Sequence, residues 1–251
     1  MLLEVGNLTG VDLSGRDFRD ANFHGMDLRG ATLNGACLAG ADLQQANLGH
    51  VDLLGAELHG ADLRGARLEY ANLSGAQLPG AKLAGARLGG ARLRSADLSG
   101  IEAHDSTFAG ADLRGASLIG ADLSGANLFW AILSAANLNA ARLEGANLEG
   151  AVMDEAILTA AGLDGARLTR ADLRYVCARG VSLAEAILVR ADLFAGNLQS
   201  ARLTGADLSG ADLQETDLRG ADLETACLLG ASHDERTRWP AGFRPPVPVA
   251  S

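Results

Sequence analysis

Several features that often identify an enzyme or a membrane protein are missing from this chain of 251 residues. Its three cysteines and five histidines match no zinc-site spacing. It contains no phosphate-binding loop and no dinucleotide fingerprint, and no stretch approaches the length of a membrane-spanning helix. Met1 to Glu4 lack the basic start and apolar run of a signal peptide. We therefore expect a non-enzymatic protein without catalytic residues, metal or cofactor.

What the chain does have is leucine at almost every fifth position, from Leu8 to Leu228. Forty-five quintets run from Gly6 to Gly230, with leucine at the centre of 39 and alanine two residues earlier in 34. A period of five would spread leucine over every face of an α-helix and over both faces of a flat strand. The chain must therefore turn a corner once per quintet, and the frequent glycine two residues after the centre suits such a turn.

The quintets Ala61–Gly65 (ADLRG) and Ala71–Gly75 (ANLSG) are typical of this pattern, which resembles the pentapeptide repeat family. The resemblance implies an all-β fold: a right-handed quadrilateral parallel β-helix, with one quintet per side, four per coil and about 11 coils. It also implies that the leucine and the alanine point inward and that the other three positions point outward. We expect one such solenoid over residues 1–230.

Two irregular quintets support this inward pair. Ala103 is a small centre with a large partner, Ile101, and Ala178 is a small centre with a large partner, Val176. Core volume is thus conserved within each quintet, as a close-packed interior requires.

The ends of a β-helix need covers, because an open end exposes a sheet edge. We assign the N-terminal cover to residues 1–5, a C-terminal cap with Trp239 and Phe243 to residues 231–243, and a disordered tail to residues 244–251. The cysteines fall on outward positions, and Cys37 and Cys177 would lie ~34 Å apart, beyond disulfide reach. Free thiols without an export signal are typical of a cytoplasmic protein.

Sorting outward residues by side shows an acidic side, centred on Phe23, Leu43, Leu63 and every twentieth residue onward. The chain has a net charge of −10, which disfavours direct binding to nucleic acid. Some proteins of the family that it resembles imitate a DNA duplex and bind DNA gyrase or topoisomerase IV. This is our leading hypothesis, giving protection from poisons (antibiotic resistance) or inhibition, and its candidate residues are Asp42, Asp62, Glu102, Asp105, Asp122, Glu144, Asp164, Asp222 and Glu224.

Four observations weigh against DNA mimicry. A duplex as long as this rod (~54 Å) carries roughly 32 phosphate charges, whereas the 31 acids of the chain are offset by 21 bases. The repeat consensus itself explains many of the aspartates. The family members that act on gyrase commonly have loops that break the coil, and several dimerise through an apolar C-terminal helix. This chain has no insertion, and four prolines follow Arg238.

The alternative hypothesis is a rigid scaffold for protein–protein interaction, with a regulatory role and no link to topoisomerases. The basic side, centred on Leu8, Leu28, Leu48 and every twentieth residue onward, carries six arginines, and Arg170 and Arg190 would stack one coil apart. Outward apolar residues gather nearby, as at protein interfaces. A protein partner or a second copy could dock there, and the candidate residues are Ile119, Phe129, Trp130, Ile132, Val152, Tyr175, Ile187, Val189 and Phe194.

Overall fold

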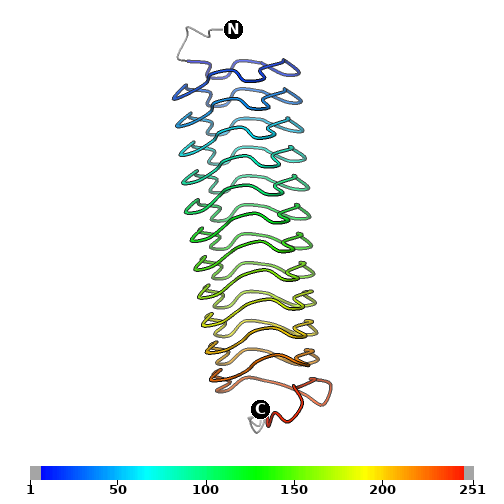
Figure 1. Cartoon of the computed structure of the whole chain (residues 1–251). Helices are drawn as coiled ribbons and strands as arrows, with labels where there is room; N and C mark the ends of the chain where they lie inside the picture. Colours follow the sequence, from blue (N-terminus) through cyan, green and yellow to red (C-terminus); the bar gives the residue numbers. More distant parts are fainter. Residues whose placement is uncertain (1–6, 246–251) are drawn as a thin grey trace.

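The computed structural model describes residues 7–245, which form a long straight rod of stacked coils (Figure 1). Parallel bridges join residues twenty apart, from Asn7↔Asp27 to Asp212↔Ser232. Four quintets per coil are thereby confirmed. Each quintet contributes one bridged residue, and within residues 7–245 there is neither a helix nor a longer strand. The right-handed sense and the number of coils stay predictions from the family.

Backbone hydrogen bonds within and between coils explain why the period is five. The N–H of Leu28 donates to Asn47 O in the next coil (2.8 Å), and the N–H of Asn47 donates back to Met26 O (2.9 Å). The N–H of Ala31 closes the corner by donating to Leu28 O (3.0 Å). We number the quintet positions one to five, so that alanine is first, leucine is third and the corner residue is fifth.

The fifth position has a positive φ throughout the described repeats, as at Gly30 (64°). Glycine tolerates this conformation, whereas other residues lose roughly 1–2 kcal/mol in it. Nineteen described non-glycine residues nevertheless adopt it, among them Tyr70, Trp130, Arg170 and Arg190. Bulky side chains at these corners are therefore not favoured by the backbone.

The first and third positions fill a continuous apolar core, as predicted. Ile101 and Ala103 are 1% and 0% exposed, and Val176 and Ala178 are 1% and 2% exposed. The same compensation operates between coils, where Gly196 follows Val176 at the first position. A Cβ on Gly196 would lie 3.0 Å from Leu193 O and 3.2 Å from Val176 Cγ1, so glycine relieves crowding next to the larger valine.

Residues 231–243 follow the last complete quintet and close the C-terminal end of the rod. The last bridge joins Asp217 to Arg238, one residue more than the usual spacing. Trp239 stacks on Phe243 with ring centroids 5.2 Å apart, and both rings pack against the core. The predicted N-terminal cover lies outside the described residues, as does most of the predicted tail.

Among residues 7–245 there is no helix long and apolar enough to cross a lipid bilayer.

Candidate protein-binding surfaces

The aspartates of the acidic side take part in the turns of the repeat. The carboxylates of Asp42, Asp62, Asp122 and Asp222 each accept the backbone N–H of the residue two positions further on, at 3.0–3.2 Å. Such a side-chain bond stabilises a turn. For Asp222, the bonds from Glu224 N–H and from the Thr204 hydroxyl hold the pKa below its usual value. Acidity at the second position therefore has a structural role.

Four of the nine predicted acidic residues also form ion pairs with arginines of the chain. Arg64 forms a bidentate pair with Asp62 and lowers the pKa of that carboxyl. Arg142 lies between Asp122 (3.4 Å) and Glu144 (3.8 Å). The remaining contacts of this kind join Arg202 to Asp164, His24 to Asp42 and His104 to Asp105, the two histidine contacts being ionic only when the ring is protonated. Within the described residues, three of the nine predicted acids form no such pair: Glu102, Asp222 and Glu224.

Charge also changes sign along the rod axis. The coil formed by residues 81–100 has four bases against one acid, a net charge of +3: Lys82, Arg87, Arg92, Arg94 and Asp97. The coil formed by residues 141–160 has one base against four acids, a net charge of −3: Arg142, Glu144, Glu149, Asp154 and Glu155. A duplex instead carries negative charge at every step.

The basic side carries three exposed aromatic residues: Tyr70 (64% exposed), Phe129 (41%) and Trp130 (60%). The rings of Phe129 and Trp130 meet edge to face, with centroids 6.2 Å apart. The indole lies over the next coil, where a Cβ on Gly150 would come within 2.9 Å of it. Glycine at position 150 therefore lets the tryptophan lie flat along the corner, with its outer face in solvent.

Two arginines continue the corner below Trp130 and Gly150. Arg170 and Arg190 are exposed and stand one coil apart at the fifth position. Neither belongs to an ion pair among residues 7–245, whereas Arg167 on the same side pairs with Glu149 (3.4 Å). Like charges stacked on neighbouring strands repel each other. This corner thus combines exposed aromatic surface with uncompensated positive charge, which is typical of protein interfaces.

Ile187 and Val189 also lie on the basic side, half-buried, whereas the remaining predicted interface residues lie on other sides. Ile132 and Val152 are bridged neighbours on the following side, and Tyr175 meets Phe194 edge to face at 5.7 Å there. Ile119 lies on a third side, 42% exposed. Of the nine predicted residues four are exposed, and five are half-buried: Ile132, Val152, Ile187, Val189 and Phe194.

Sequence reasoning missed Leu229, which is 79% exposed on the basic side. It also missed a shallow groove of about 440 Å³ on the same side, beside Gly49. His50 and Tyr70 stack along one edge of this groove, with centroids 5.2 Å apart. Sorting the outward residues beyond Phe194 by side would have found Leu229, whereas the groove depends on side-chain conformation.

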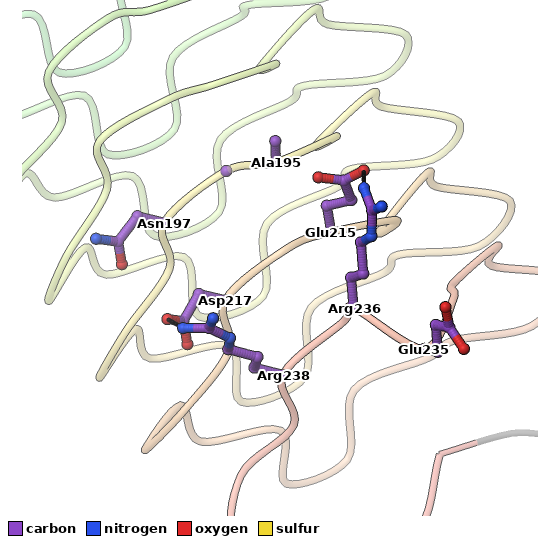
Figure 2. A pocket seen from close by; sticks show the side chains of 8 residues that line it. Ala195, Asn197, Glu215, Asp217, Glu235, Arg236 and Arg238 are labelled. Carbon is purple, nitrogen blue, oxygen red and sulfur yellow. Dashed lines mark hydrogen bonds and ion pairs between the residues drawn. The ribbon is translucent and has the colours of Figure 1, made fainter.

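A second hollow, of about 450 Å³, lies near the C-terminal end. Figure 2 shows Arg236 reaching Glu215 and Arg238 lying beside Asp217. The Arg219 guanidinium also pairs with Asp217 and lowers the pKa of that carboxyl. Because these acids and bases form ion pairs with one another, the residues that line the hollow connect the end segment to the last coils.

Cys37, Cys177 and Cys227 are free thiols. In the described part of the chain, no cluster of three or more histidine, cysteine or acidic side chains could hold a metal ion.

The stacked coils, leucine core and outward polar positions define an all-β solenoid. Its quintets match the family model for pentapeptide repeats in 8 copies, over residues 7–45, 36–78, 61–100, 96–134, 136–174 and 186–224. The chain belongs to the pentapeptide repeat family. No curated protein matches it.

Several solved structures are similar to the chain. A pentapeptide repeat protein from the thylakoid lumen of Arabidopsis thaliana is 35% identical over 38% of this chain and 66% of its own, just under two thirds of its length, with a TM-score of 0.37. HetL from the cyanobacterium Nostoc sp., a pentapeptide repeat protein involved in heterocyst differentiation regulation, is 32% identical over 90% of this chain and 87% of its own (TM-score 0.27). QnrB1, a plasmid-mediated fluoroquinolone resistance protein, is 19% identical over 90% of each chain (TM-score 0.28).

Proposed function

We propose that this protein is a non-enzymatic, protein-binding rod whose main docking surface is the basic side. The proposal is carried by one observation: Trp130 and Phe129 expose aromatic surface on the side that also holds the unpaired Arg170 and Arg190. Tryptophan and arginine are enriched among the residues that contribute most to protein–protein affinity. The rod itself supplies a rigid support for them.

Trp130, Arg170 and Arg190 hold φ values of 54°, 58° and 56°. Sixteen other described non-glycine corner residues share this conformation, so the proposal rests on the side chains and not on the backbone. A partner with acidic groups and an apolar anchor would neutralise the arginines and cover the indole.

The test is to isolate partners from the native cell extract with wild-type protein and with Trp130→Gly. Tyr70→Gly is the matched control, because Tyr70 occupies the same corner column with the same backbone conformation (φ 59°) but lies three coils away from Trp130, outside the corner formed with Arg170 and Arg190. We expect a protein that binds the wild type and the control but not Trp130→Gly. Equal recovery with all three forms would contradict the docking surface.

A second candidate function is DNA mimicry toward DNA gyrase or topoisomerase IV. It is favoured by the net charge of −10 and by the unpaired carboxylates of Glu102, Asp222 and Glu224 on the acidic side. The arginine pairs of four of the nine acids and the change in the sign of charge along the axis place it second.

This second candidate predicts that the protein protects gyrase from a poison, or inhibits it, in a supercoiling assay. The effect should weaken with salt and with the combined variant Asp42→Asn, Asp62→Asn, Asp122→Asn and Asp222→Asn. Asparagine keeps the oxygen that accepts the turn hydrogen bond and removes only the charge. No effect of the wild-type protein on either enzyme would sink this candidate.

A further inference from the structure

We infer that the corner around Trp130 binds an extended acidic segment of a partner protein, with an apolar residue on the indole and carboxylates on Arg170 and Arg190. The inference rests on the proposed docking surface and names the chemistry of its occupant. Its basis is the order of residues along one column of the rod, where Trp130, Gly150, Arg170 and Arg190 occupy the corner position of four successive coils.

At both ends of this column the side chain lies along the corner, over the coil that follows. The indole of Trp130 covers Gly150, where a Cβ would come within 2.9 Å of the ring, and a Cβ on Gly210 would lie 3.3 Å from Arg190 Cγ. The two glycines leave room for the side chain of the preceding coil. The column therefore presents its binding groups as a row that runs parallel to the rod axis.

The N-terminal end of the column has apolar neighbours. Phe129 contacts Trp130 edge to face on the basic side. On the following side, Ile132 and its bridged neighbour Val152 come two residues after Trp130 and Gly150 and are half-buried. An apolar side chain placed on the indole would thus be surrounded by further apolar surface.

The C-terminal end of the column is positively charged, and the acids beside it have contacts of their own. Asp172 and Asp192, on the following side, lie 2.6 Å and 3.7 Å from Arg174. Each also accepts the backbone N–H of the residue two positions further on. Arg170 and Arg190, in contrast, form no ion pair among residues 7–245. The column thus changes from apolar to positive along the axis, which calls for an occupant with an apolar end and an acidic end.

The spacing of the column matches an extended segment. Neighbouring coils are ~4.8 Å apart, so Trp130 and Arg190 are separated by roughly 14 Å along the axis. In an extended chain every second side chain points to the same face, with a repeat of about 6.6 Å, so three such side chains span about 13 Å. The first then lies on Trp130, the third on Arg190, and the middle one within reach of the long side chain of Arg170.

The recognised sequence is therefore an apolar residue with acids at the second and fourth positions from it. The corner is a convex edge with a single row of binding groups, whereas a helix usually docks in an apolar groove. An extended chain can follow such a row in either direction, so the acids stand before or after the apolar residue.

Each of these contacts replaces an unfavourable one in the free protein. Arg170 and Arg190 repel each other across one coil, and a carboxylate on each guanidinium removes this repulsion and adds charge-assisted hydrogen bonds. An apolar side chain on the indole removes aromatic surface from water. The other four arginines of the basic side already form ion pairs within the chain, so the acidic segment is directed to this corner: Arg29, Arg67, Arg87 and Arg167.

Isothermal titration calorimetry of the full chain with a synthetic peptide tests the inference. The probe is LSESE with blocked ends, which carries a leucine and two glutamates at the inferred spacing. The control peptide LESES has the same composition, but its leucine and its glutamates point to opposite faces of an extended chain. We expect LSESE to bind, and LESES to bind roughly tenfold more weakly because its leucine cannot cover the indole.

Two double variants with the same change in charge locate the site. Arg170→Gln with Arg190→Gln removes both unpaired arginines and should raise the dissociation constant of LSESE roughly fivefold or more. Arg67→Gln with Arg87→Gln removes two paired arginines from the same side and should leave it nearly unchanged. In Trp130→Gly the leucine loses its contact, so LSESE and LESES should bind alike. A melting curve for each variant separates loss of binding from loss of the fold.

The extended acidic segment would be overturned by a wild-type chain that does not bind LSESE or binds LESES equally well, or by equal weakening in the two double variants. Its failure is distinguishable from failure of the docking surface. A protein from the cell extract that is lost on Trp130→Gly, in a chain that does not bind LSESE, would keep the docking surface and remove this occupant. Specific binding of LSESE, with no protein lost from the extract, would keep the peptide site and remove the proposed function.

Discussion

The acidic side and the basic side of the rod are built from the same quintet, yet their charged side chains differ in the hydrogen bonds and ion pairs that they form. On the acidic side the aspartates close turns, and four of the nine predicted acids pair with an arginine, as Asp62 does with Arg64. On the basic side four of the six arginines also form ion pairs, whereas Arg170 and Arg190 stay unpaired next to an exposed indole. The contrast distinguishes charged residues that stabilise the turns of the repeat from charged residues that make no such contact.

Both sides share one core, and the largest effect should come from breaking it. Leu148→Ala on the basic side and Leu143→Ala on the acidic side remove fully buried leucines from adjacent quintets. Each should lower the free energy of unfolding by about 2–5 kcal/mol, since a cavity is left in a close-packed interior. Urea denaturation measures this. A large loss on one side only would mean that the sides do not share a continuous core.

An intermediate effect is expected at the corner of the basic side. Trp130→Gly places the residue that φ 54° favours at this position, and it removes the contacts of the indole with Phe129 and Gly150. These changes oppose each other, so the free energy of unfolding should change by no more than about 1 kcal/mol. Thermal denaturation checks this, with Tyr70→Gly as control. A much larger loss would make Trp130 a structural residue.

The fold was accessible from sequence because one repeated constraint dominates it. Leucine every fifth residue requires a corner per quintet, and exchanges such as Ile101 with Ala103 identify the two inward positions. Surface chemistry was less accessible, because it depends on contacts between residues twenty apart. The reach of Arg202 to Asp164 across two coils, and the stacking of His50 on Tyr70, follow from side-chain conformation that the repeat leaves free.

The buried threonines near the C-terminal end were also not predicted by the repeat pattern. Thr216 is fully buried at a first position, where the repeat favours alanine. Its hydroxyl donates to Leu193 O at 2.9 Å, and Thr237 in the next coil donates to Leu213 O at the same distance. Buried hydroxyls are tolerated when they are hydrogen-bonded. A departure from consensus can therefore have a structural explanation that only the coordinates provide.

The smallest effect should sharpen the contrast between paired and unpaired charge. Asp62→Asn keeps the turn bond to the Arg64 N–H and removes the ion pair, so it should cost roughly 0.2–1 kcal/mol at neutral pH. Arg190→Gln has no pair to lose and should leave the stability unchanged. The pKa of Asp62 is lowered by Arg64, so the pair contributes above the ordinary carboxyl pKa of 3.8 and is lost as pH falls below it. The difference between wild type and Asp62→Asn should accordingly shrink in denaturation curves recorded below pH 3.8; a difference that persists there would mean that the ion pair with Arg64 is not its cause.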